Sequence, residues 1–167
     1  MKLSRIALLL SAATVLEFFV GGSPHRSAFP VDWFLLATAT VARSGDFVRA
    51  VLTGAAAGFL EDGVSQRLLG MNAFAKAAIG YALTLVSVRV VFGGALAVGG
   101  ALAAASLANE AIVALLSALL LQSPIVIVSR DAIWRAVATG VTGGVLEAAW
   151  GFSWGEWWKR RRLRRLR

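Results

Sequence analysis

Three ionisable residues stand deep within long apolar stretches of the sequence, and they are Lys76, Glu110 and Glu147. A charge placed in hydrocarbon is costly, so such residues pair with one another or mark a path or site for an ion or a ligand. A lysine with a carboxylate partner is the least costly arrangement. We therefore expect Lys76 to form an ion pair with Glu110 or Glu147 across a helical bundle. The chemistry open to these residues is structural pairing, ligand or ion binding, or proton transfer.

Four further acidic residues lie nearer the ends of apolar stretches, and they are Glu17, Asp32, Glu61 and Asp62. Asp32 follows Pro30, a combination typical of a helix start, because proline fits the first turn and a carboxylate complements the helix dipole. Glu17 is close enough to the end of its stretch to reach the membrane surface. Glu61 and Asp62 are adjacent, so on a helix they point about 100° apart and cannot act as a facing carboxylate pair.

The sequence carries no motif for catalysis. It has no cysteine and a single histidine, His25, which excludes thiol nucleophiles and metal sites built from several histidines. It has neither the glycine–serine turn of α/β-hydrolases nor a phosphate-binding P-loop. We expect a protein that is not an enzyme and that uses no metal, no cofactor and no small-molecule substrate.

The composition indicates which elements must position these residues. Of the 167 residues, 58% are hydrophobic before glycine is counted and only 16% are charged, whereas soluble domains are about 45–50% apolar with glycine included. Six spans of ~20 residues would use ~120 positions and leave no room for a second domain. We therefore expect an all-α integral membrane protein, with a six-transmembrane-helix bundle over residues 1–158 and a basic cytoplasmic tail over residues 159–167.

The apolar stretches give the expected helices: Ile6–Val20, Phe29–Ala42, Phe47–Leu60, Met71–Val88, Leu96–Leu121 and Asp131–Trp154. The second and third are so short that they would have to borrow flanking residues or thin the bilayer. The region around the fifth could hold either one helix or two. A single helix there, giving six spans, puts most basic residues on the cytoplasmic side, as the positive-inside rule requires. Both termini are then cytoplasmic.

The net charge of +8 is concentrated at the C-terminus, where seven of the seventeen basic residues lie in the last nine positions. A nucleic-acid-binding protein should instead spread its basic residues over a folded face, so no nucleic-acid partner is expected. Four tryptophans share one helix face just before this run. We expect them to lie at the membrane interface and the basic residues to contact anionic lipid head groups; docking of a partner is the alternative. The residues concerned are Trp150, Trp154, Trp157, Trp158, Lys159, Arg160, Arg161 and Arg162.

Glycine patterns indicate where helices pack closely. Gly54 with Gly58, and Gly140 with Gly144, are both G-x-x-x-G pairs, which let helix backbones approach one another in lipid. In a chain rich in glycine and alanine, such pairs also arise easily by chance.

A composite motif covers the middle of the chain, from Pro30 to about Arg89. Its residues are Pro30, Asp32, Gly58, Phe59, Asp62, Gly70, Asn72, Gly80 and Tyr81. We expect Asp62 to accept backbone N–H groups from the following loop or to cap the next helix. Gly70 then adopts a backbone conformation closed to other residues, and Asn72 caps the fourth helix. The pattern predicts a rigid connection between helices.

This motif resembles that of the rod shape-determining protein MreD family, in which a helix ending in G-F-x-x-D is followed by a short loop, leucine–glycine and a helix carrying G-Y. The chain departs from the family in the sixth helix, where it has Glu147 and a tryptophan-rich end in place of a proline. The resemblance implies a fold like that of the substrate-binding component of energy-coupling-factor transporters. It also implies a location in the bacterial cytoplasmic (inner) membrane.

The function that the resemblance implies is a non-catalytic scaffold of the cell-wall elongation (rod) complex. Its partners would be an MreC-like single-span protein and the glycosyltransferase RodA with its class B penicillin-binding protein, a transpeptidase. Two alternatives stay open. The same fold class permits a small-solute (vitamin-type) binding subunit of an energy-coupling-factor transporter, and the deep charges permit a channel or proton pathway.

Overall fold

The computed structural model describes residues 3–21, 30–65, 68–89, 94–121 and 129–164, with the side chains of 20, 21 and 150–164 outside the description. These residues form helices and, among them, no strand. The helices are α1 (Leu3–Gly21), α2 (Trp33–Ala42), α3 (Phe47–Ser65), α4 (Met71–Arg89), α5 (Ala95–Leu121) and α6 (Arg130–Arg164). The expected all-α class, with six helices, is confirmed.

The helix bounds agree best with the sequence in the middle of the chain. Helices α4 and α5 begin and end within one residue of their expected bounds, and α5 is a single helix. Helix α3 instead continues five residues past Leu60, which brings Glu61 and Asp62 into its last turns. Helix α2 is shorter than expected, with 10 residues. At 1.5 Å per residue it is about 15 Å long, which is roughly half of a bilayer core.

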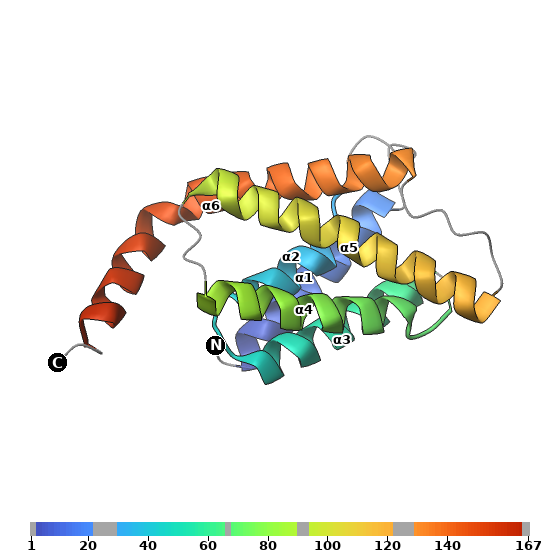
Figure 1. Ribbon diagram of the computed structural model, residues 1–167, viewed down its shortest axis with the longest axis horizontal. Coiled ribbons are helices and arrows are strands. Elements are labelled where there is room, and N and C mark those ends of the chain that lie inside the picture. Colours follow the sequence, from blue (N-terminus) through green and yellow to red (C-terminus); the bar gives the residue numbers. More distant parts are fainter. Residues whose placement is uncertain (1–2, 22–29, 66–67, 90–93, 122–128, 165–167) are drawn as a thin grey trace.

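Helix α2 is the centre of the bundle. It contacts each of the other five helices, and in Figure 1 it lies between the α5–α6 pair and the α3–α4 pair. Its sequence is apolar all round, as a fully surrounded helix requires. Phe34 packs with residues of α1 and α3, Leu35 packs with residues of α4 and α5, and Leu36 packs with Val98 and Leu102 of α5.

Glycines allow the two outer helix pairs to pack with their backbones nearly touching. A Cβ atom on Gly54 would overlap the backbone carbonyl of Lys76 in the neighbouring helix α4. Between α5 and α6, a Cβ on Gly140 would lie 2.8 Å from the carbonyl oxygen of Gly99, and one on Gly144 would lie 3.1 Å from that of Ala95. Both G-x-x-x-G pairs therefore mark close helix contacts, as the sequence predicts.

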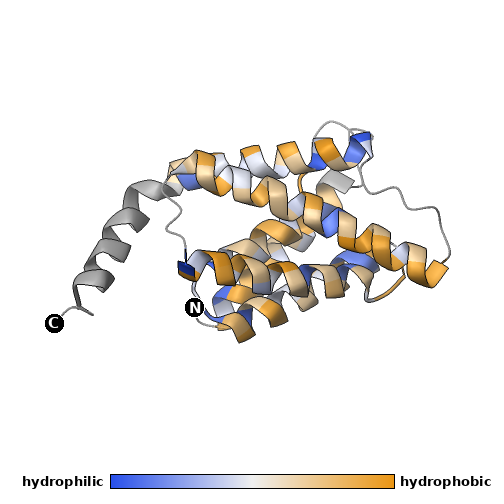
Figure 2. Ribbon diagram, in the orientation of Figure 1, coloured by the Kyte–Doolittle hydropathy of each residue, from blue (hydrophilic) through white to orange (hydrophobic). Residues whose placement is uncertain are grey.

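The protein combines an apolar core with several buried charged and polar side chains, and it exposes many large apolar residues. Charged and polar residues, including Asp32, Glu61, Asp62 and Lys76, are buried, whereas large apolar residues such as Leu96, at 94% exposure, lie on the outside. Figure 2 shows that hydrophobic residues make up much of the described helices, with hydrophilic residues scattered among them. Among the described residues, α4 and α5 are long and apolar enough to cross a membrane. Large exposed apolar surfaces mark contact with a membrane or a partner protein.

Candidate functional site

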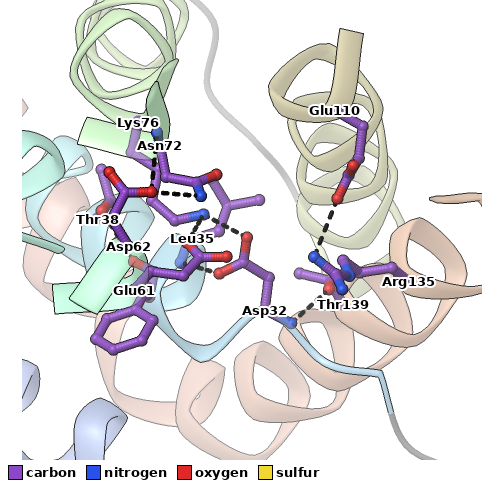
Figure 3. Close-up of polar contacts among 11 residues, drawn as sticks. Asp32, Leu35, Thr38, Glu61, Asp62, Asn72, Lys76, Glu110, Arg135 and Thr139 are labelled. Atoms are coloured by element: carbon purple, nitrogen blue, oxygen red, sulfur yellow. Dashed lines mark hydrogen bonds and ion pairs between the residues drawn. The ribbon is translucent and has the colours of Figure 1, made fainter. Parts of the chain in front are cut away.

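Three buried charged residues from three different parts of the fold meet inside the bundle. Lys76 Nζ lies 2.5 Å from Asp32 Oδ2 and 2.8 Å from Glu61 Oε2. The Lys76 side chain is completely buried, and the two carboxylates are nearly so. We refer to Asp32, Glu61 and Lys76 as the buried triad; Figure 3 shows these residues converging from the start of α2, the end of α3 and the first half of α4.

Asp32 connects more elements than any other member of the triad. Its Oδ1 accepts a hydrogen bond of 2.7 Å from the Leu35 backbone N–H, so it caps α2 as the sequence predicts. Its own backbone N–H donates to Thr139 Oγ1 of α6 at 3.0 Å. One residue thus starts α2, pairs with α4 and holds α6 (Figure 3).

The expected pairing of Lys76 with Glu110 or Glu147 is wrong. Glu110 of α5 instead pairs with Arg135 of α6 at 3.0 Å, and Glu147 of α6 accepts two hydrogen bonds from the guanidinium of Arg43, at 2.5 and 3.0 Å. Lys76 pairs instead with Glu61, which lies in the last turns of α3 because that helix continues past Leu60. Asp32 supplies the second carboxylate from the start of α2.

Sequence reasoning missed the partners Glu61, Arg43 and Arg135 for a common reason. Each lies near the edge of an apolar stretch, where a charge is most simply explained by contact with water or head groups. The available signal was the balance of charges. Lys76, Glu110 and Glu147 comprise two carboxylates and one cation, so at least one carboxylate must pair with a cation from elsewhere in the chain. That signal indicates that partners exist but not which residues they are.

Asp62 joins the end of α3 to the start of α4. Its carboxylate accepts hydrogen bonds from the Gly70 backbone N–H at 2.7 Å, from the Asn72 backbone N–H at 3.3 Å, and from Asn72 Nδ2 at 2.8 Å. The expected loop-binding role of Asp62 is confirmed, and Gly70 has the expected positive φ, +103°. The expected capping by Asn72 is wrong, because Asn72 already lies inside α4 and its side chain donates to Asp62.

The remaining motif residues lie on the same α3–α4 hairpin or at the start of α2. A Cβ on Gly58 would overlap the backbone of Asn72, and one on Gly80 would lie 2.7 Å from the Ala50 carbonyl oxygen. Phe59 and Tyr81 point outwards, with exposures of 50% and 52%, and Tyr81 packs on the ring of Phe47. Pro30 is half-buried two residues before Asp32. The motif therefore combines close backbone contacts at Gly58 and Gly80 with two partly exposed aromatic rings, those of Phe59 and Tyr81.

A second group of buried polar atoms lies on or near α5. Ser106 Oγ, Asn109 Oδ1 and Trp33 Nε1 have no hydrogen-bond partner among the described residues. Asn109 is one helical turn from Ala105 and from Val113, which pack against residues of α4. Asn109 thus belongs to the face of α5 that is turned towards α4.

Several expected site residues lie outside the described part of the chain. The side chains of Trp150, Trp154, Trp157, Trp158, Lys159, Arg160, Arg161 and Arg162 are among them, although the α6 backbone continues to Arg164. His25 also lies outside it. The expectations of an aromatic belt and of lipid contact at the basic tail therefore stay predictions.

The polar contacts of the described residues join helices to one another and pair buried charges of opposite sign. Three interhelical ion pairs or networks tie α2 to α4, α5 to α6, and the end of α2 to α6. The described residues contain no group of three or more metal-ligating side chains. No family model, curated protein or solved structure matches the chain.

Proposed function

We propose that the chain is a non-catalytic membrane scaffold of the bacterial cell-wall elongation complex, similar to the MreD family, that binds partner helices from the side within the cytoplasmic membrane. Its partners would be an MreC-like single-span protein and the RodA–transpeptidase pair. Its role in cell shape would be to hold these proteins together rather than to catalyse peptidoglycan synthesis.

The observation that carries this proposal is the construction of the α3–α4 hairpin. Inside it, Asp62 binds three N–H groups and Gly58 lets the two backbones meet. Outside it, Phe59 and Tyr81 are half-exposed on a rigid support. Aromatic side chains held rigidly at a surface are typical anchors of protein interfaces, and the residues that build this hairpin are those of the MreD-like motif.

The ion pairs of the described residues also favour a structural role. Lys76, Glu110 and Glu147, the deep charges that would line a catalytic or transport site, each pair with a residue of another helix or helix cap. Charges used in this way fix the register of helices in lipid. A scaffold needs such fixed geometry because its partners bind to its outer surface.

The first test is affinity purification of the tagged chain from its native host in mild detergent, followed by mass spectrometry. An MreC-like protein together with RodA and its transpeptidase would support the proposal. Phe59→Ala and Tyr81→Ala should each reduce their recovery, while Leu96→Ala, on the exposed side of α5, should not. Normal recovery in both aromatic variants, with unchanged amounts of the bait, would refute the proposed contact surface.

A second candidate is the solute-binding subunit of an energy-coupling-factor transporter. It is favoured by the buried Ser106 and Asn109 side chains, whose oxygens have no partner among the described residues and so could bind a polar ligand. The same purification separates the two candidates. Recovery of paired ATPases with a shared transmembrane coupling protein would favour the transporter and overturn the scaffold.

We further propose six spans with both termini in the cytoplasm. The chain contains no cysteine, so a single introduced cysteine reports its own location. A membrane-impermeant maleimide added to intact spheroplasts should label Ser129→Cys, before α6, but not Ser44→Cys, after α2, until the membrane is opened. Both positions are exposed in the protein. Labelling of both in intact spheroplasts would exclude this topology.

A further inference from the structure

The buried triad has one negative charge too many. With every group ionised, the carboxylates of Asp32 and Glu61 carry two negative charges and Lys76 carries one positive charge. A surplus charge inside an apolar bundle is strongly unfavourable unless a counter-charge or several hydrogen bonds stabilise it. The surroundings of the triad therefore decide whether the surplus can persist.

The charged groups facing the triad from the neighbouring helices do not supply a free counter-charge. From α6, Arg135 lies beside Asp32 (Figure 3), but its guanidinium is bound to Glu110 of α5. From α3, Asp62 adds another carboxylate, which is stabilised by its own three N–H donors. From α1, Glu17 adds a further negative charge that interacts with Arg135. Arg135 attracts the Glu61 carboxylate, but Glu110, Asp62 and Glu17 together carry more negative charge than Arg135 carries positive charge.

Within the triad, the two carboxyl groups are not equally supported. Asp32 accepts a hydrogen bond from Lys76 and another from the Leu35 N–H. Glu61 Oε2 lies 2.8 Å from Lys76 Nζ, and no further donor among the described residues reaches this oxygen. A buried carboxylate requires several donors, whereas a neutral carboxylic acid requires far less. Glu61 is thus the weaker of the two sites for a negative charge.

We propose that the buried triad is a proton-binding site whose exchangeable proton is carried by the carboxyl group of Glu61. Uptake of one proton from water converts the Glu61 carboxylate into a neutral carboxylic acid by forming one O–H bond. The triad then changes from a net charge of −1 to zero, while Lys76 stays paired with Asp32. This site is separate from the partner-binding surface proposed above, and either can fail without the other.

Infrared spectroscopy tests the proposal directly, because a protonated carboxyl group has a carbonyl band distinct from the bands of a carboxylate. The full chain in lipid nanodiscs at neutral pH should show this band, and Glu61→Gln should lose it. Glu110→Gln is the matched control, since Glu110 is bound to Arg135 and should not contribute. Absence of the band in the unmodified protein, or its persistence in Glu61→Gln, would overturn the proposal.

Isotope labelling keeps the test decisive even if Glu61→Gln does not fold. With ¹³C at the side-chain carboxyl of glutamate alone, the band of the unmodified chain should shift to lower frequency. A band that does not shift would belong to an aspartate and would overturn the assignment to Glu61. A band that shifts but disappears in Glu110→Gln would overturn it equally.

Thermal unfolding gives an independent readout. In the pH range where Glu61 keeps its proton in the folded chain but ionises in the unfolded chain, which begins near the ordinary glutamate pKa, a rise in pH favours unfolding. The Tm of the unmodified chain should therefore fall relative to that of Glu61→Gln as the pH rises from about 4 to about 7. We expect a relative shift of about 3 °C or more, which is the size of a modest stability change in a chain of this length. Parallel pH dependences of the two proteins would contradict the proposal.

Discussion

At the scale of single residues, the stability of the protein interior depends on how the ammonium group of Lys76, which is shielded from water, is paired. Lys76 is fully buried, and its ammonium group lies within ion-pair distance of the carboxyl groups of Asp32 and Glu61. Replacing a whole buried ion pair with apolar residues is often tolerated, whereas removing one partner leaves an uncompensated charge. Lys76 and Asp32 should therefore tolerate joint replacement far better than separate replacement.

Replacing Lys76 with methionine should destabilise the protein by about 3–5 kcal/mol, because it leaves the Asp32 carboxylate buried without a cation. The double variant Lys76→Met/Asp32→Asn should recover a large part of this loss. Thermal unfolding of the two single variants and the double variant in detergent measures the coupling. If the losses of the single variants simply add in the double variant, the two residues do not stabilise one another.

Replacing Asp62 with alanine should lower the free energy of unfolding by about 1–3 kcal/mol, because buried N–H groups at Gly70 and Asn72 lose their acceptor. Asp46→Ala is the control, since the partly exposed Asp46 also accepts a backbone N–H bond from Arg49 and pairs with its side chain, but water can replace both contacts. The loss should therefore be smaller. Unchanged melting of Asp62→Ala with lost partner binding would instead place Asp62 in an interface.

At the scale of helices, the bundle consists of two pairs joined through α2. Helices α3 and α4 meet at Gly54, Gly58 and Gly80, and α5 and α6 meet at Gly99, Gly140 and Gly144. Such contacts leave no space for a side chain, so the distance between the helices of a pair is set by the glycines themselves. The effect of a glycine-to-alanine substitution on the free energy of unfolding should thus depend strongly on whether that glycine lies at such a contact.

Gly58→Ala should destabilise the protein by about 1–3 kcal/mol, because its methyl group would overlap the backbone of Asn72 and Ala73. Gly100→Ala is the matched control in a helix, since nothing lies within 4 Å of a Cβ at that position. There the better helix propensity of alanine should add up to about 1 kcal/mol. Thermal melting in detergent should therefore move in opposite directions for the two variants; a common direction would refute the packing argument.

Helix identity and most helix bounds could be predicted from the sequence, because long apolar runs and turn residues are local signals. The start of α2 at Asp32 and the role of Asp62 were also local, since caps act within a few residues. The partners of Lys76 could not be predicted, because residues 44 positions apart are brought together only by packing. The extension of α3 through Glu61 was not predicted either, because the sequence has polar residues and a glycine directly after Leu60.

At the scale of the whole molecule, the shortest helix is the one that all others surround. Since α2 contacts every other helix and most of its residues are buried, no part of the bundle can separate far without exposing it. Local opening should therefore occur at the periphery, while opening of α2 should require global unfolding.

Hydrogen–deuterium exchange in detergent should accordingly show the slowest amide exchange in α2. Exchange should be faster at the start of α6, because the helices that α6 contacts within the described part of the chain are α5 and α2 alone. Mass spectrometry of peptides covering the two segments measures this difference. Exchange in α2 that is as fast as in α6 would mean that the two helical pairs separate while each stays folded.

Asp32 both caps α2 and pairs with Lys76, and this has a consequence for folding during synthesis of the chain. Asp32 and Lys76 are 44 residues apart, and at about 5–20 residues per second the ribosome delivers the second roughly 2–9 s after the first. During that interval the Asp32 carboxylate has no ammonium partner, because Lys76 has not yet been synthesised. The buried contacts between α2 and α4 can therefore form only after α4 has been synthesised. We expect a nascent chain that is released before that point to be degraded by the cell's quality-control proteases.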